Sequence, residues 1–297
     1  MKTIHKILLI GGDKRTAVIE HNLRKACPET EILSLCAEHS PPESASSEEI
    51  HRQAEDADVL ILPLPLCTDG ENMTVTAEGI RKKLPLRPFL ETLPPGKLIL
   101  GGQIPYFFKR LIEECGSVPG DYFDSESVQL RNAVPTAEGA LGIAVTELPV
   151  TVAGCPIVIT GYGRCGYALA SRLHLLGADV TVAVRRREAQ IMAEVDGCRS
   201  IPLRQLQTDP PRCRMLFNTI PAPILTADTL RKLPDDCILT ELASGDISGL
   251  EAEARKAGLR YIRAAGLPGK TAPETAGNIL TESILEWIGN YRGEAYV

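Results

Sequence analysis

The chain has 297 residues, 44% of them hydrophobic and 24% charged, and this length predicts two domains of roughly 150 residues each. The net charge of −6 argues against a nucleic-acid-binding protein, because phosphate binding needs a concentrated basic face. The first apolar run, Ile7–Ile10, is too short for a signal peptide or a membrane span. The nine cysteines are scattered without a Cys-x-x-Cys motif, which predicts free thiols and a cytoplasmic protein.

Short apolar runs alternate with amphipathic stretches, a pattern that predicts parallel βαβ units. Segments rich in Pro, Ser and Glu interrupt the pattern, and they are expected at the surface as non-helical connections: Ser40–Glu49 and Leu84–Gly96. The strands expected in the first half are Ile7–Ile10, Glu31–Leu35, Val59–Leu62 and Lys97–Leu100, with helices at Arg15–Ala26 and Pro105–Cys115.

The second half has a more regular pattern. Its expected strands are Ile157–Thr160, Val180–Val184, Arg199–Ile201, Met215–Asn218, Ile238–Glu241 and Arg260–Arg263, with helices at Arg164–Leu176 and Leu250–Lys256. Six strands in this arrangement fit a complete doubly wound nucleotide-binding domain. A helix over Pro135–Leu148, with Thr136 as its N-cap, is expected to join the halves, and a last helix over Glu274–Gly289 is expected to return to the first domain.

Together these elements predict an α/β protein of two Rossmann-like domains with a cleft between them. The first domain, flavodoxin-like and carrying the substrate site, is expected over residues 1–130 together with the C-terminal helix within 272–297. A connecting helix is expected over 131–148, and the doubly wound NAD(P)-binding domain over 149–270.

One motif has the spacing G-x-G-x-x-G and consists of Gly161, Tyr162, Gly163, Arg164, Cys165 and Gly166. It follows an apolar run directly and opens a predicted helix, which is the context that a dinucleotide-binding turn requires. In such a turn the first glycine makes the tight bend, the second lets the backbone approach a pyrophosphate, and the third allows close packing of helix and sheet. A glycine-rich turn without a ligand is the alternative, but the flanks favour dinucleotide binding.

The end of the following strand distinguishes the two nicotinamide dinucleotides. NAD-specific sites place an acidic residue there, whereas this chain has Arg185 and Arg186. Guanidinium groups can bind a 2′-phosphate in bidentate fashion. The sequence therefore favours NADP over NAD, with a solvated turn as the alternative interpretation.

Other strand ends are expected at the same edge of the sheet, because the carboxyl ends of parallel strands meet there. Those expected to border the cofactor are Asn218, Thr219, Ile220, Pro221 and Ala243, and Ser244 follows the last of them. Lys270 is expected in a loop after the final strand. Glu138, Lys270 and Glu241 are the candidates for proton transfer, and the histidines form no metal-binding pattern.

In the first half, Gly12, Asp13 and Arg15 lie between a predicted strand and a predicted helix. Backbone N–H groups and a guanidinium at such a position can receive a carboxylate, although a solvated first helical turn is an equal alternative. Thr68 follows another predicted strand and can form hydrogen bonds.

Several strings spread over nearly the full length resemble the A subunits of bacterial dipicolinate synthase. They are Ile10–Arg15, Asn132–Gly139, the glycine hexad, Asn218–Pro221, Leu242–Ser244 and Gly266–Gly277. The strings at Asn132–Gly139 and Gly266–Gly277 are the most specific. The chain departs from the family at Glu241, where Asp is general, and at Gly245–Ile247.

The resemblance implies oxidation of a dihydrodipicolinate, drawn from the lysine pathway, to dipicolinate during sporulation, in the mother cell of a spore-forming bacterium. It implies NADP or NAD as cofactor, a partner in the form of a flavoprotein-like B subunit, and a homo-oligomer. Glu138 or Lys270 would accept the proton. The substrate dicarboxylate would be bound by Gly12, Asp13, Arg15, Thr68, Thr136, Ser244 and Lys270. A non-catalytic NADP-binding sensor or scaffold and a stand-alone amino- or keto-acid dehydrogenase remain the alternatives.

Overall fold

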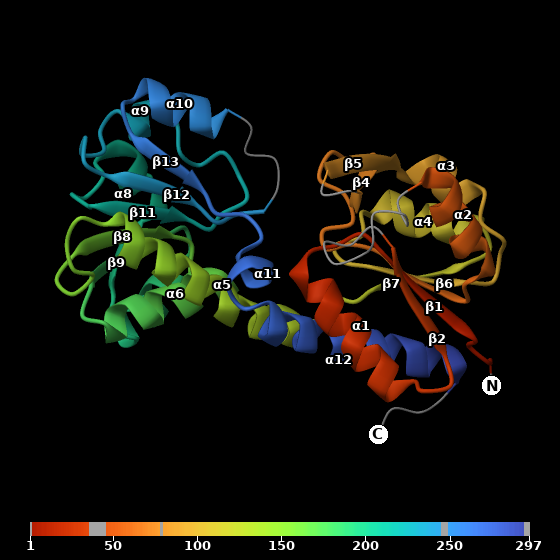
Figure 1. Cartoon of the computed structure of the whole chain (residues 1–297). Coiled ribbons are helices and arrows are strands. Elements are labelled where there is room, and N and C mark those ends of the chain that lie inside the picture. Colours follow the sequence, from red (N-terminus) through yellow and green to blue (C-terminus); the bar gives the residue numbers. More distant parts are fainter. Residues whose placement is uncertain (1, 36–45, 78–79, 245–248, 294–297) are drawn as a thin grey trace. The chain divides into compact units, whose positions relative to one another are not determined.

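The computed structural model describes residues 2–35, 46–77, 80–244 and 249–293. The chain forms two compact units: the first comprises Met1–Arg131 and Ala272–Val297, and the second comprises Asn132–Thr271 (Figure 1). Most of the predicted loop Ser40–Glu49 and all of Gly245–Ile247 lie outside the described residues. Within the described ranges, no helix is both long enough and apolar enough to span a membrane.

The first unit contains a five-stranded parallel sheet in the order β2-β1-β3-β6-β7, which is the flavodoxin-like order and confirms that prediction. Its strands are β1 (Lys6–Ile10), β2 (Glu31–Leu35), β3 (Val59–Ile61), β6 (Leu98–Gly101) and β7 (Val118–Asp121). Strand β7 was not predicted, because its residues Val-Pro-Gly-Asp are typical of a turn. As an edge strand β7 tolerates its proline, since one side of the strand needs no ladder hydrogen bonds.

The helices of the first unit are α1 (Lys14–Ala26), α2 (Ser47–Asp56), α3 (Leu86–Glu91), α4 (Tyr106–Glu114) and α12 (Pro273–Arg292). Helix α12 packs against α1 (Figure 1), and Gly277 makes this close approach possible. A Cβ atom added there would lie 2.6 Å from Cβ of Val18. The helix predicted over Glu274–Gly289 is thus present and lies in the first unit.

The proline-rich segment Leu84–Gly96 is not the exposed connection that the sequence predicts. An antiparallel hairpin of β4 (Asn72–Ala77) and β5 (Ile80–Pro85) leads into helix α3. Phe89 and Leu90 are both 1% exposed. The prediction was wrong because the apolar residues between the prolines contribute to the core, and the prolines shorten the helix without exposing it.

The second unit contains a six-stranded parallel sheet in the order β10-β9-β8-β11-β12-β13, the doubly wound order of dinucleotide-binding domains. Its strands are β8 (Pro156–Thr160), β9 (Asp179–Val184), β10 (Arg199–Pro202), β11 (Met215–Asn218), β12 (Ile238–Glu241) and β13 (Arg260–Arg263). Its helices are α6 (Arg164–Leu175), α7 (Arg187–Val195), α8 (Leu203–Thr208), α9 (Ala227–Leu230), α10 (Leu250–Lys256) and α11 (Leu267–Thr271). All six predicted strands are present.

Helix α5 (Glu126–Glu147) runs from the first unit into the second and begins well before the predicted start at Pro135. Thr136 is therefore not an N-cap but an interior residue, and its Oγ1 donates to the carbonyl of Asn132 at 2.8 Å. The misassignment has a local cause, because proline is usual in the first turn of a helix and here lies inside the helix. Lys270 likewise lies in helix α11 and not in a loop.

Candidate functional site

The glycine turn joins β8 to α6 in the second unit. Gly161 has φ +86°, and a Cβ atom there would lie 2.8 Å from Oγ1 of Thr219. A Cβ atom on Gly166 would lie 2.3 Å from the carbonyl oxygen of Gly161, whereas one on Gly163 would meet nothing within 4 Å. The first and third glycines are therefore required by the protein's own packing, and the second faces open space.

That open space adjoins the N-terminus of α6. Gly163 is the N-cap of this 12-residue helix, and no side chain caps it. The first N–H groups of a helix have no partners within the helix and carry a partial positive charge. The turn thus fits a pyrophosphate, because it combines N–H donors, room for an anion and no Cβ at the point of approach.

The other residues of the hexad make specific contacts. The hydroxyl of Tyr162 donates to Asp196 at 2.6 Å, and burial together with this carboxylate raises the pKa of Tyr162 well above its ordinary value. Cys165 forms a hydrogen bond with the side chain of Thr136 on α5, while burial raises the pKa of its thiol. Arg164 is exposed. A predicted substrate residue, Thr136, therefore lies beside the cofactor turn.

Arg185 and Arg186 lie directly after β9 and are exposed. Arg187 pairs with Gln190 and Glu194 of its own helix. Within the described part of the chain, neither Arg185 nor Arg186 forms an ion pair. Their guanidinium groups are thus available to an external anion.

Asn218, at the end of β11, is only 1% exposed and directs its amide into the protein. Its Nδ2 donates to Oε2 of Glu241 at 2.7 Å. Its Oδ1 accepts from Oγ1 of Thr160 at 2.5 Å. The residues that follow reach the surface, since Thr219 and Ile220 are half-buried and Pro221 is exposed.

The loop after β12 begins in the interior. Ala243 is 6% exposed, and its N–H donates to Oε1 of Glu241 at 2.7 Å. Ser244 is exposed. Glu241 has 0% exposure and both of its oxygens accept hydrogen bonds, so it cannot contact a substrate as a proton acceptor.

The two remaining candidates for proton transfer are exposed. Glu138 lies on α5, with its Oε1 3.5 Å from Nη2 of Arg172. Lys270 lies on α11. Gly139 lets these helices approach closely, because a Cβ atom there would lie 3.0 Å from Leu267 and from Thr271. The structure therefore places both candidates on neighbouring helices of the second unit.

In the first unit, Asp13 is the N-cap of α1, and its Oδ1 accepts from the backbone N–H of Arg15 at 3.0 Å. The guanidinium of Arg15 also donates to both carboxylate oxygens of Asp13, each at 2.8 Å, and to the carbonyl of Leu64 at 3.0 Å. Arg15 is only 7% exposed. These contacts neutralise its charge inside the protein. Gly12 has φ +95° and fits because a Cβ atom would lie 2.1 Å from Oγ1 of Thr16.

Thr68 is exposed beside Asp69. The Asp69 carboxylate binds Nζ of Lys83 at 2.7 Å. This bond and those donated by Asn72 and Glu71 hold the pKa of Asp69 far below its ordinary value. Of the predicted substrate residues in the first unit, Thr68 is thus the most accessible.

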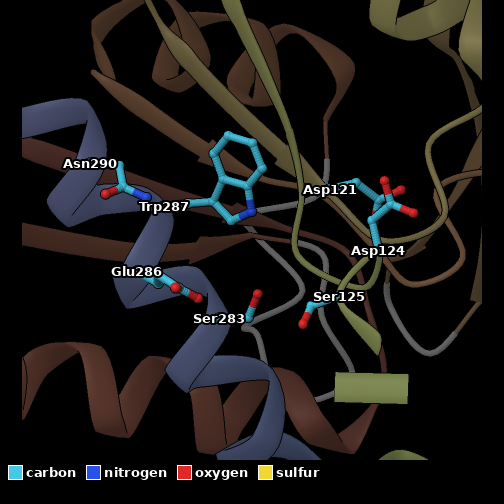
Figure 2. A pocket seen from close by; sticks show the side chains of 7 residues that line it. All are labelled: Asp121, Asp124, Ser125, Ser283, Glu286, Trp287 and Asn290. Atoms are coloured by element: carbon cyan, nitrogen blue, oxygen red, sulfur yellow. The ribbon is translucent and has the colours of Figure 1, made fainter. Parts of the chain in front are cut away.

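A cavity of about 350 Å³ also lies in the first unit, between α12 and the segment after β7 (Figure 2). Its lining contains three carboxylates and none of the residues predicted from the sequence: Asp121, Asp124, Ser125, Ser283, Glu286, Trp287 and Asn290. The nearby ammonium of Lys109 already pairs with Asp124 at 3.3 Å. This acidic lining is unsuited to a dicarboxylate. Among the described residues, no group of His, Cys, Asp and Glu is arranged to hold a metal ion.

Three residues that support the predicted site were not found from the sequence: Thr160, Arg172 and Asp196. Thr160 offered a signal, because it is the one polar residue of the run Pro156–Thr160. The other two are ordinary helix-face and turn residues in the sequence, and only the fold brings them to Glu138 and Tyr162.

Comparisons with known proteins agree with these features. Residues 6–123 match the family model of the N-terminal domain of the dipicolinate synthase A subunit. The A subunit of dipicolinate synthase from Bacillus subtilis is 25% identical over 297 residues, which are 99% of each chain. A crystal structure of the dipicolinate synthase A chain from that species has a TM-score of 0.77 over 99% of both chains.

Two further solved structures share the fold. The A subunit of dipicolinate synthase from Bacillus halodurans has a TM-score of 0.78 at 22% identity, over 95% of this chain and 97% of that one. A D-lactate dehydrogenase with NAD+ from Lactobacillus jensenii has a TM-score of 0.55 at 12% identity, over 98% of each chain. The resemblance predicted from the motifs is thereby confirmed, and residues 6–123 belong to the family of N-terminal domains of dipicolinate synthase A subunits.

Proposed function

We propose that this chain is the dehydrogenase subunit of a dipicolinate synthase and oxidises a dihydrodipicolinate to pyridine-2,6-dicarboxylate with a nicotinamide dinucleotide. The observation that carries the proposal is the turn from β8 to α6, where Gly163 faces open space while its two partner glycines are required by packing. The likeness to the dipicolinate synthase A subunit over 99% of the chain supplies the substrate class. The NAD+ named with the D-lactate dehydrogenase of the same fold supports the cofactor class.

The reaction removes two electrons and two hydrogens from the dihydropyridine ring. The cofactor, when bound, accepts the hydride, and the protein accepts one proton. Aromatisation of the ring favours the products, so the main tasks of the protein are to hold and orient the reactants. The N–H groups at the start of α6 would hold the pyrophosphate, and Thr219, Ile220, Pro221 and Ala243 would border the nicotinamide.

We infer that the dinucleotide is NADP, because Arg185 and Arg186 lie where a 2′-phosphate would be recognised and neither forms an ion pair within the described residues. The substitution R185Q is expected to weaken NADPH binding about tenfold or more, since a hydrogen bond to a charged group contributes about 1.5–3 kcal/mol. NADH binding should change little. R187Q is the matched control, because Arg187 pairs within α7; equal losses for NADPH and NADH would contradict the assignment.

For the proton acceptor, Glu138 and Lys270 remain the two candidates, because both are exposed and lie on neighbouring helices. The predicted substrate contacts are Gly12, Asp13, Arg15 and Thr68 in the first unit and Thr136, Ser244 and Lys270 in the second. The pairing of Arg15 with Asp13 leaves Lys270 as the cation among them best able to bind a substrate carboxylate. The rate of K270A should therefore fall both by weaker substrate binding and, if Lys270 is the acceptor, by a lower kcat.

The designation of the relative by the letter of one subunit supports a partner B subunit, for which we propose a flavoprotein-like chain. A homo-oligomer, a role in sporulation in the mother cell, and a substrate drawn from the lysine pathway belong to the same proposal. A redox sensor or scaffold and a stand-alone amino- or keto-acid dehydrogenase are the competing functions.

One experiment separates these functions: the chain, alone and with its B subunit, is mixed with dihydrodipicolinate and NADP+ or NAD+. Formation of dipicolinate and of reduced nucleotide is followed by ultraviolet absorbance. Stoichiometric formation of both products supports the proposal, and a requirement for the second subunit would assign catalysis to the complex. Bound nucleotide without turnover in any mixture would refute it in favour of a sensor, and turnover of a 2-hydroxy or 2-amino acid instead would favour the stand-alone enzyme.

A further inference from the structure

Glu241 is a carboxylate with no exposed surface, at the end of the central strand β12. Oε2 accepts from Nδ2 of Asn218 and Oε1 accepts from the N–H of Ala243, both at 2.7 Å. Burial raises the pKa of Glu241, while these two bonds and the charge of Arg263 lower it. Because a buried carboxylate is costly and a hydrophobic residue of similar volume usually stabilises as well or better, stability alone does not account for Glu241.

The hydrogen bonds of Glu241 continue across the sheet. Asn218 Oδ1 accepts from Oγ1 of Thr160 at 2.5 Å and from the N–H of Ile220 at 3.3 Å, and its Nδ2 lies 3.2 Å from the carbonyl oxygen of Ile220. Thr160 Oγ1 in turn accepts from the N–H of Thr219 at 3.2 Å. The ends of β8, β11 and β12 are thus joined by one chain of hydrogen bonds.

This chain of hydrogen bonds has a fixed direction. Thr160 donates to the amide oxygen of Asn218, and the amide nitrogen of Asn218 donates to Glu241. The acceptor at the end must accept from two donors at once, and an ionised carboxylate does this without offering a proton of its own. An amide in place of the carboxylate would set two N–H₂ groups facing each other or force Asn218 to turn over.

We propose that Glu241 is a positioning residue that, through Asn218 and Ala243, sets the backbone of the two loops that would border the nicotinamide. The inference rests on the proposed function for the identity of the ligand, but its geometry is that of the second unit alone. It corrects the interpretation of Glu241 as a proton acceptor and of Asn218 as a direct cofactor contact, because both side chains face each other inside the protein. The loops, not these side chains, would touch the cofactor.

The test is a set of near-isosteric variants: E241Q, N218D and the double variant N218D/E241Q. E241Q opposes two donors, and N218D opposes two carboxylates. In the double variant, the new carboxylate on β11 accepts from the new amide on β12 as well as from Thr160 and Ile220, and the bond from Ala243 is kept. The pairing of donors and acceptors is thereby restored with the negative charge moved to the neighbouring strand. T240V is the control for a change at a buried position of the same strand, since Thr240 also has 0% exposure.

Three measurements are made on each variant. Amide hydrogen exchange at Thr219, Ile220 and Ala243 reports the loops without any ligand, and NADPH affinity reports the site. Turnover of dihydrodipicolinate with the B subunit is the third measurement. We expect each single variant to exchange these amides faster and to lose about ten- to a hundredfold in kcat, as misplacement of reactants by about 1 Å does. KM should change less than about threefold, since the pyrophosphate and substrate contacts remain.

The double variant should recover at least part of kcat and of the amide protection, whereas T240V should match the wild type in both. A purely structural role would lower the unfolding midpoint without dividing kcat from KM, and the double variant would then be worse than either single one. Either that pattern or wild-type exchange and kinetics in E241Q would overturn the proposal. If the wild type itself proves inactive, the proposed function fails, while hydrogen exchange and NADPH affinity still decide the role of Glu241.

Discussion

Two glycines of the same turn are expected to respond to alanine in opposite ways. In G166A the new Cβ atom would begin 2.3 Å from the carbonyl oxygen of Gly161 and must move to at least 3.0 Å. In G163A the new Cβ meets no protein atom within 4 Å, and the backbone there has φ −84°, which alanine adopts without strain. The first substitution therefore disturbs the protein, and the second disturbs only a ligand.

The magnitudes follow from the packing of α6. Moving this helix away from β8 loosens Leu169, Ala170 and Leu173, all 0% exposed, so G166A should cost about 1–3 kcal/mol of unfolding free energy or more. G163A exchanges one N-cap residue for a poorer one and should cost about 1 kcal/mol or less. Its methyl group occupies the approach of the pyrophosphate, and losing one charged hydrogen bond there raises the Kd for NADPH about 10- to 100-fold.

Urea unfolding followed by circular dichroism gives the stability, and quenching of protein fluorescence or nucleotide fluorescence gives the Kd. G142A serves as control, because Gly142 is exposed in the middle of α5 with nothing within 4 Å of an added Cβ. Alanine there should raise the stability by about 0.5–1 kcal/mol and leave the Kd unchanged. Wild-type NADPH affinity in G163A would refute the assignment of this turn to a pyrophosphate, and wild-type stability in G166A would refute the packing argument.

Other predictions concern both units. G277A should destabilise the contact of α12 with α1 by about 1–3 kcal/mol, because its Cβ would lie 2.6 Å from Val18, and adding V18A should restore part of the loss in a thermal unfolding cycle. R15A should cost about 3–5 kcal/mol by leaving Asp13 unpaired in a nearly buried site; a large rise in KM with unchanged stability would instead make Arg15 a substrate ligand. Since burial raises the pKa of Glu241 above 4.5, the folded state retains a proton that the unfolded state has released, so unfolding free energy should fall as pH rises through this window. E241Q should abolish that slope in urea titrations at several pH values, and an unchanged slope would contradict the shift.

The fold was predictable where the signal is local. All six strands of the second unit follow from apolar runs separated by helices, and Gly161, Gly163 and Gly166 indicate the turn through their spacing alone. The N-terminal start of α5 was not predictable in this way, because Pro135 is a usual helix start and here lies inside a helix. Edge strand β7 was missed because its pairing with β6, and not its composition, makes it a strand.

The candidate site divides along the same line. The amino-acid sequence alone establishes which residue types stand at the carboxyl ends of the strands: the open glycine, the arginines after β9 and the polar ends of β11 and β12. Which of these face outward depends on the tertiary fold, because burial and pairing involve residues distant in the sequence. The fold turns Asn218 and Glu241 toward each other across 23 positions and brings the buried sulfurs of Cys213 and Cys237 within 3.6 Å. It also closes Arg15 onto Asp13 and Leu64, and it leaves Arg185 and Lys270 exposed.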